Sequence, residues 1–141
     1  MAINASKVLT GGLAAGVVGN IIGFIGFGLL LGPRMQAEAE AVAPALAGRG
    51  ASGGPILTNV VSQFVIGLLI TWLYAAMRPR FGPGMKTASL AALTVWICGL
   101  LFHVDWLLLG MMSPSTYVMA SVLALVQVLA VSAVGGMLYS E

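Results

Sequence analysis

Four long apolar runs fill most of the chain, and they restrict its fold more than any other feature of the sequence. They cover about residues 8–31, 56–77, 87–112 and 115–139. A membrane's hydrocarbon layer is ~30 Å thick and takes about 20 helical residues to cross, so each run is long enough. None contains Lys, Arg or Glu, and Asp105 is the only acid within any run. We therefore predict an all-α polytopic membrane protein, with residues 1–141 forming one four-helix transmembrane bundle.

The rest of the composition excludes several classes of function. Charged residues make up 7% of the chain, and mean hydropathy is +1.04, which excludes a water-soluble fold. Six basic and four acidic residues are too few and too scattered for a nucleic-acid-binding surface. Cys98 is the single cysteine, which excludes an intrachain disulfide and a thiolate metal cluster. Motifs of hydrolases, metalloproteases and phosphate-binding loops are missing, so we expect no enzymatic activity and no metal site.

Basic residues in the short loops predict the orientation of the chain. The connection between the second and third runs carries Arg78, Arg80 and Lys86. Short loops rich in Lys and Arg stay cytoplasmic, so we expect cytoplasmic N- and C-termini; a bacterial inner membrane is the location that the family resemblance given below implies. We also expect these three side chains to contact anionic lipid headgroups. The first run is longer than the apolar core of a signal peptide, about 7–15 residues, and we expect it to be retained as a span.

Five glycines recur along the first run at spacings of four and three. They include two GxxxG pairs, and they are Gly12, Gly16, Gly19, Gly23 and Gly26. Bare backbone lets two helices approach closely in lipid, where no hydrophobic force drives helices together. We predict a helix-packing interface along this face. Its partner is either another span of the same chain, or a second copy or larger membrane protein.

Three amide side chains lie inside the apolar runs and predict a polar interior: Asn20, Gln63 and Gln127. Gln63 belongs to a polar stripe of the second run that also includes Asn59 and Thr71. An unpaired amide is costly in hydrocarbon. In one interpretation, interhelical hydrogen bonds of about 0.6–2 kcal/mol each fix the helix register. In the other, the amides line a small polar cavity open to the outside.

His103 and Asp105, in the third run, are the candidate ligand residues. His103 is the only histidine, and it is either an axial ligand of haem or chlorin, a proton carrier, or an interfacial side chain bonded to backbone. Asp105 is either an ion-handling carboxylate or the ion-pair partner of Arg34 or Arg49 at the outer surface. Two residues apart on a helix, His103 and Asp105 point about 200° apart, so we do not expect them to share a site.

Two segments of the chain resemble a known family. They are residues 8–20, VLTGGLAAGVVGN, and residues 72–88, WLYAAMRPRFGPGMKTA. Both resemble a widespread, uncharacterised family of small bacterial four-span membrane proteins, and the second segment carries the closer resemblance. The resemblance implies a bacterial membrane protein of four helices, and it implies no activity.

These observations favour a non-catalytic integral membrane protein. We predict an accessory or structural subunit that packs its glycine face on a larger bacterial membrane complex, for example an energy-transducing one. The alternative is a small carrier or ligand-binding protein with a polar cavity, and a weaker alternative is haem or pigment binding through His103. Otherwise we expect no cofactor. The expected partners are the lipid bilayer and other membrane subunits or a second copy, but not nucleic acid.

Overall fold

The computed structural model describes residues 3–46, 49 and 52–139, and all regular structure in this part of the chain is helical. Its elements in chain order are α1 (Ala5–Gly23), a π-helical continuation η1 (Phe24–Leu30), α2 (Gly32–Val42), a short 3₁₀ turn η2 (Pro44–Leu46), α3 (Gly53–Phe81), α4 (Met85–Leu108) and α5 (Pro114–Leu138). Four segments are long and apolar enough to cross a membrane: α1 with η1, α3, α4 and α5. The predicted all-α, four-helix transmembrane fold is confirmed, and the chain is a multi-pass membrane protein.

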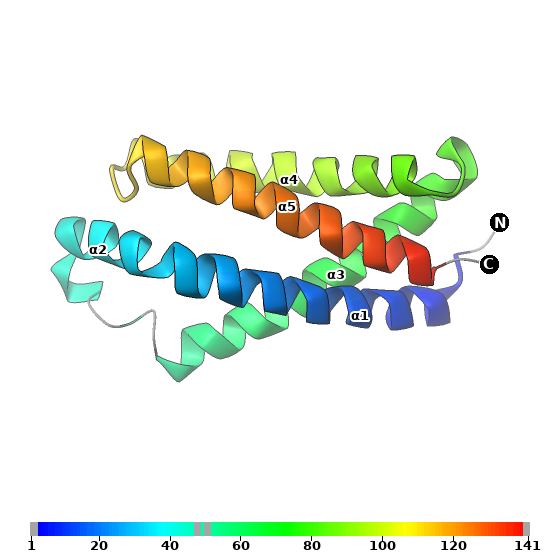
Figure 1. Cartoon of the computed structure of the whole chain (residues 1–141), viewed down its shortest axis with the longest axis horizontal. Coiled ribbons are helices and arrows are strands. Elements are labelled where there is room, and N and C mark those ends of the chain that lie inside the picture. Colours follow the sequence, from blue (N-terminus) through cyan, green and yellow to red (C-terminus); the bar gives the residue numbers. More distant parts are fainter. Residues whose placement is uncertain (1–2, 47–48, 50–51, 140–141) are drawn as a thin grey trace.

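The four spans form one bundle in which α1 packs against both α3 and α5, and α4 packs against α5 (Figure 1). The backbone N–H of Asn4 donates to the Tyr139 hydroxyl over 3.1 Å, so the two described ends of the chain lie together. We call this end, which also holds the turn between α3 and α4, the terminal end. The opposite end is the α2 end. Which end faces the cytoplasm stays a prediction.

The second span is longer than the predicted run of residues 56–77. Pro79 lies inside α3, which continues to Phe81. Proline has a helical φ, although inside a helix it removes one backbone hydrogen bond and its ring crowds the carbonyl four residues earlier. The helix ends instead where glycines adopt positive φ, at Gly82 (82°) and Gly84 (116°). The Tyr74 hydroxyl accepts a hydrogen bond from the Gly84 N–H over 3.1 Å and holds this turn against α3.

The first span changes its winding near the α2 end before the chain enters α2. Residues of η1 form the wider turns of a π-helix, which places Phe24 outward and Gly26 inward. Pro33 then sits in the first turn of α2, where its missing N–H costs nothing. Ala- and Glu-rich sequence favours helix here, and α2 follows directly on the first span.

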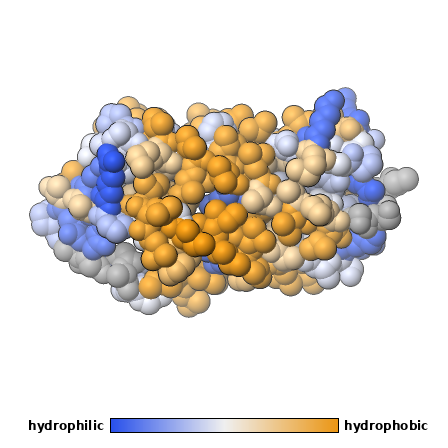
Figure 2. Space-filling view, viewed as in Figure 1, coloured by the Kyte–Doolittle hydropathy of each residue, from blue (hydrophilic) through white to orange (hydrophobic). Residues whose placement is uncertain are grey.

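The interior is built from small and hydroxylated residues, while large apolar side chains face outward. Ala15, Ile70 and Val131 form the middle of the core, and Thr71 and Ser132 are buried beside them. Figure 2 shows an apolar belt around the middle of the visible face and hydrophilic surface at both ends. Large side chains gain nothing by leaving lipid, so close backbone contact and hydrogen bonds hold such a bundle together.

One half of α4 is left uncovered by α3. Helix α3 runs obliquely, meets α4 at the terminal end and diverges from it toward the α2 end (Figure 1). Residues 101–106 in this half of α4 are all exposed. These six residues make more than one turn, so they point in all directions around the helix; we call this segment the open face of α4. On its other side, α4 is fastened to α5, because the Trp96 indole donates to the Ser121 carbonyl over 2.8 Å.

Candidate functional site

The glycine face of α1 lies against other helices of the same chain. A Cβ added at Gly12 would stand 2.7 Å from the Leu68 Cα, and one at Gly16 would stand 2.8 Å from the Phe64 Cα. Both contacts are with α3 backbone, which cannot rotate away as a side chain can. Gly67 of α3 faces back, and a Cβ there would meet the Gly12 carbonyl oxygen at 2.5 Å. Bare backbone therefore meets bare backbone between α1 and α3.

The remaining three glycines meet α5 and one side chain of α3. A Cβ at Gly23 would stand 2.9 Å from the Gln127 Nε2, and one at Gly26 would overlap the Leu123 side chain. Gly19 lies against Gln63 and Val131, with an added Cβ 3.0 Å from the Gln63 Oε1. Of the two partners that the sequence left open, the structure supplies the intrachain one. This face is thus occupied within the chain, and the expected packing of the chain on a larger complex stays a prediction.

The interior amides join three helices near the middle of the bundle. Gln127 is buried, and its Nε2 donates to the Gly19 carbonyl over 2.7 Å and to the Gln63 Oε1 over 3.1 Å. Asn20 donates to the Gly16 carbonyl over 3.0 Å and to the Val60 carbonyl over 3.3 Å. No buried side-chain nitrogen or oxygen lacks a partner within the described part of the chain. These hydrogen bonds tether α1, α3 and α5 to one another.

Only part of the polar stripe on α3 reaches this interior. Thr71 is buried and donates to the Gly67 carbonyl of its own helix over 2.8 Å. Gln63 is half-buried beside Gln127. Asn59 is exposed, because α3 has by then diverged from the bundle. Four-residue spacing predicted one face correctly, but the tilt of the helix decides how far along that face the bundle extends.

A polar cluster that the sequence did not reveal fastens α2 to the start of α5. Both carboxylate oxygens of Glu38 are engaged: Oε2 accepts from the Ser113 N–H over 2.9 Å, and Oε1 accepts from the Thr116 hydroxyl over 2.7 Å. Arg34 pairs with Glu38 over 3.2 Å and donates to the Ser115 hydroxyl over 2.6 Å. We call these five residues the α2 clasp.

The α2 clasp holds its carboxylate in the charged form. The Ser113 backbone N–H, and next the Thr116 hydroxyl, lower the pKa of Glu38 from 4.5 to about 2. Two local signals exist in the sequence: Ser113 before Pro114 is typical of a helix start, and Arg34 and Glu38 have the four-residue spacing of a helical ion pair. Neither signal says that the two segments meet.

His103 and Asp105 both lie in the segment that we call the open face of α4, but they point about 200° apart around the helix, and neither is brought together with another candidate residue. The His103 Nδ1 lies 2.8 Å from the Gly99 carbonyl of its own helix, and its ring is 6.4 Å from that of Trp106. Asp105 accepts a hydrogen bond from the Trp106 N–H over 3.0 Å. The expected pairing of Asp105 with Arg34 is wrong, because Arg34 belongs to the α2 clasp.

The three basic residues predicted to contact headgroups all lie at the terminal end, at the turn between α3 and α4. Arg80 and Lys86 are exposed, and Arg78 is half-buried with its guanidinium carbon 5.8 Å from the centre of the Tyr139 ring. In the described part of the chain, no three residues among His, Cys, Asp and Glu gather as a metal site.

The family resemblance of residues 8–20 and 72–88 stays a prediction. No family model, curated protein or solved structure matches the chain.

Proposed function

We propose that this chain is a non-catalytic structural subunit of a membrane assembly, and that it meets a partner's membrane-spanning helix through the open face of α4. One observation carries this proposal. His103 is an exposed polar side chain within a spanning helix, on the half of α4 that α3 leaves uncovered. Polar residues within spans usually face a bundle interior, so an exposed one favours a second protein surface beside it.

The depth of His103 makes its exposure significant. The 24 residues of α4 are about 36 Å long, so a centred helix extends about 3 Å beyond each side of a ~30 Å hydrocarbon layer. His103 lies five residues before the last helical residue, Leu108, and therefore roughly 5 Å inside the hydrocarbon. Asp105 lies at the boundary, where its carboxylate reaches headgroups and water. The imidazole is therefore the polar group within the hydrocarbon, where lipid tails offer it no hydrogen bond.

The apolar neighbours of His103 suit a helix partner without requiring one. Leu101 and Phe102 are 70% and 79% exposed and stand out from α4 as large knobs. Lipid tails would solvate these side chains as well as a protein would, so they do not argue for a partner by themselves. The imidazole is the stronger argument for a partner helix, because its second ring nitrogen makes no hydrogen bond within the described residues.

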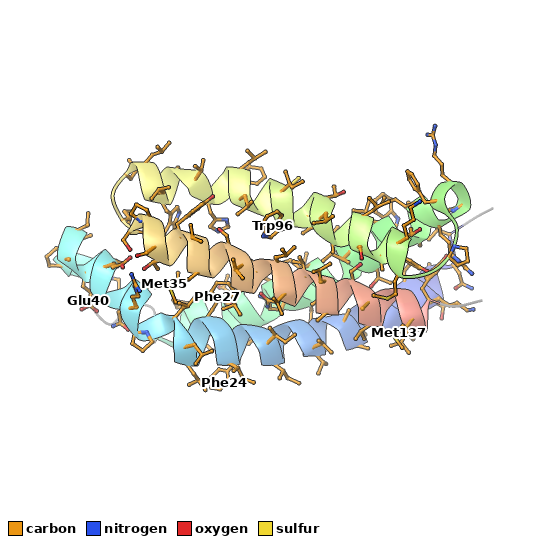
Figure 3. All side chains as sticks on the ribbon, turned by 45° about the horizontal axis from the view of Figure 1, so that its top comes forward. Phe24, Phe27, Met35, Glu40, Trp96 and Met137 are labelled. Carbon is orange, nitrogen blue, oxygen red and sulfur yellow. The ribbon has the colours of Figure 1, made fainter. Side chains whose placement is uncertain are left out.

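Photocrosslinking from two matched phenylalanines tests the proposal. Phe102 lies on the open face of α4, and Phe24 points away from the bundle on the first span (Figure 3). Their exposed fractions, 79% and 65%, are similar, so lipid contact is comparable at the two sites. A photoreactive phenylalanine analogue at 102, but not at 24, should form a protein adduct in native membranes. Adducts with lipid alone at both positions would contradict the proposal.

A substitution then tests whether the adduct at position 102 depends on a specific contact of His103 or only on a protein lying nearby. His103→Leu should remove most of the adduct formed at 102, because it deletes the polar anchor. Thr94→Leu is the control: Thr94 is an exposed polar residue of α4 outside the open face, and its hydroxyl donates to the carbonyl of Leu90. An absorption spectrum of the purified chain covers the haem alternative, since visible absorbance lost in His103→Leu would assign the face to a pigment instead.

The carrier alternative draws on the incomplete burial of Gln63 and the exposure of Asn59 on the same face of α3. A hydrated crevice would reach Gln63 along that face. Its test is thiol labelling by a membrane-impermeant reagent of Gln63→Cys and Asn59→Cys. The exposed native thiol is first removed by Cys98→Ser. Labelling at both positions would favour a water-filled path, whereas labelling at 59 alone would confine water to the α2 end.

A further inference from the structure

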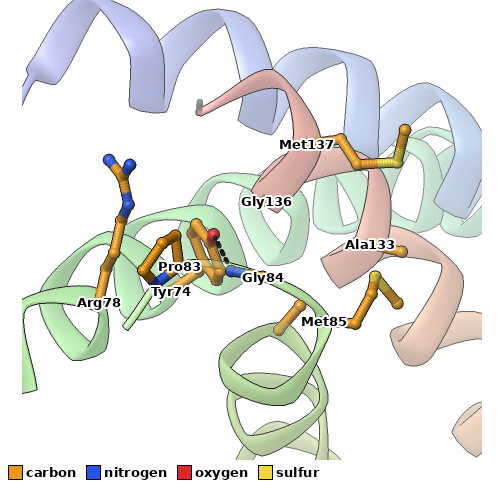
Figure 4. Close-up of a pocket in the computed structure, with 9 residues that line it drawn as sticks. Tyr74, Arg78, Pro83, Gly84, Met85, Ala133, Gly136 and Met137 are labelled. Atoms are coloured by element: carbon orange, nitrogen blue, oxygen red, sulfur yellow. Dashed lines mark hydrogen bonds between the residues drawn. The ribbon is translucent and has the colours of Figure 1, made fainter. Parts of the chain in front are cut away.

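We propose that the terminal end holds a binding site for one acyl chain of an anionic phospholipid, in a pocket between α3, α4 and α5. The pocket has a volume of about 280 Å³. Apolar walls come from Pro83, Met85, Ala133 and Met137, and Arg78 stands at its edge (Figure 4). This inference is independent of the proposed partner of α4, because it uses the other end of the molecule.

The pocket exists because small residues meet where three helices converge. Gly136 lies flat on the Tyr74 ring, and a Cβ there would stand 3.2 Å from the ring edge. Ala133, one turn earlier on α5, leaves unfilled space beside it. The one wall hydroxyl, that of Tyr74, already accepts the Gly84 N–H. The ligand that fits is therefore apolar along most of its length.

The position of the pocket identifies an acyl chain as that ligand. The pocket is lined by C-terminal turns of α3 and α5, the first turn of α4 and the turn residues Pro83 and Gly84, and Arg78 is the first charged residue after the apolar run of α3. A lipid tail is the apolar group present at this depth in every membrane. Pockets that enclose a whole drug-sized ligand are about 300–1,000 Å³ in volume, so this one holds a single chain rather than a whole lipid. It is also too small for a helix, which is about 10 Å wide.

The charge around the pocket selects an anionic headgroup. A chain seated in the pocket places its phosphate near the level of the turn that carries Arg78, Arg80 and Lys86, with Arg80 and Lys86 exposed. Residues 78–104 contain no acid. Positive charge at the rim attracts anionic lipid over zwitterionic lipid. Free inorganic phosphate would meet the same charges but would leave the apolar walls empty.

Labelling of the unmodified chain is the first test. The full-length protein is reconstituted in phosphatidylcholine vesicles that contain a small fraction of phosphatidylglycerol with a photoreactive tail. Labelled peptides at Met85 and Met137 should exceed those at Met119, an exposed methionine of α5 outside the pocket. Unlabelled phosphatidylglycerol should remove the excess, and phosphatidylcholine should not. Equal labelling at the three methionines would overturn the site, and equal competition by both lipids would overturn its charge preference.

Filling the pocket is the second test. Ala133→Phe places a ring in the space of the acyl chain and should weaken retention of one phosphatidylglycerol by about tenfold in native mass spectrometry. Ala76→Phe adds the same ring at an exposed position of α3 and should leave retention unchanged. The paired variant Arg80→Gln and Lys86→Gln should lower the preference for phosphatidylglycerol over phosphatidylcholine without emptying the pocket. Retention unchanged in Ala133→Phe would overturn the site, as would retention of inorganic phosphate in place of lipid.

Discussion

The glycine face of α1 and the open face of α4 are both surfaces of membrane-spanning helices, and they differ in what covers them. Gly12 and Gly16 touch the backbone of α3, and their face is closed within the chain. Phe102 and His103 are exposed, on the half of α4 that α3 leaves uncovered. Small residues in lipid mark contacts between helices, and here those contacts are already made. A polar residue that faces outward marks a contact that is still open.

The difference has a physical basis in what lipid can and cannot replace. A lipid tail packs against Phe102 about as well as a neighbouring helix does, so an exposed phenylalanine carries little information about partners. A lipid tail cannot donate to the Gly19 carbonyl, which Gln127 satisfies over 2.7 Å, and it cannot bond an imidazole. Polar groups are therefore the better guide to protein contacts in this bundle, and bare backbone is a guide only to where two helices can come close.

The largest expected effect follows from filling the closed face. Gly16→Leu should destabilise the bundle by about 3 kcal/mol, because the new side chain meets the Phe64 Cα and α3 backbone must move. Gly28→Leu, on an exposed glycine of the same span, should change stability by no more than about 1 kcal/mol. Unfolding in mixed micelles measures both. A stable Gly16→Leu chain that loses only a partner would return the glycine face to an intersubunit role.

A smaller effect is expected from the amide tether. Gln127→Leu removes donors from the Gly19 carbonyl and from Gln63, and it should cost about 1–2 kcal/mol in the same assay. Gln63→Leu should cost less, since Gln127 keeps its bond to Gly19. A double-mutant cycle gives the coupling between the two amides, which we expect to be about 0.6 kcal/mol. Zero coupling would mean that the 3.1 Å contact contributes nothing to the bundle.

The α2 clasp should make the α2 end sensitive to acid. Glu38 has a pKa of about 2 in the folded chain against 4.5 ordinarily, so the folded state favours the carboxylate. Its contribution to stability is therefore complete above about pH 4.5 and is lost as pH falls from there toward 2. The thermal midpoint of the wild-type chain should fall over this window. In Glu38→Gln that part of the decline should be missing, whereas Glu40→Gln should keep it.

Sequence patterns predicted the spans well because length and apolarity are local properties. The second apolar run was placed at residues 56–77, whereas α3 continues through Pro79 to Phe81 and ends where Gly82 takes a positive φ. The glycine spacing predicted a close helix contact but not its partner, because nothing in the sequence around Gly16 identifies Phe64 as the residue it contacts. Proximity in the folded bundle is what such local patterns omit.

The α2 clasp shows the same limit for a polar site. Glu38 and Ser113 are 75 positions apart, and each has an adequate local explanation in an ion pair and a helix cap. The exposure of His103 was equally hidden, because it depends on the tilt of α3 rather than on α4 itself. Residue types in the runs thus indicated which groups need partners, and the angles between helices decided which of them find one within the chain.

The smallest expected effect on stability, in the open face of α4, is also the one that best separates the two surfaces. His103→Leu should change the stability of the isolated chain by no more than about 0.5 kcal/mol, because the hydrogen bond and the ring contact that the imidazole makes with described residues are both within α4. The same substitution should remove most of the photocrosslink at 102. His103 would then support the assembly and not the fold of its own chain, whereas Gly16 supports the fold. Destabilisation comparable to that of Gln127→Leu would instead show that His103 supports the bundle, and the open face would then be a surface for lipid.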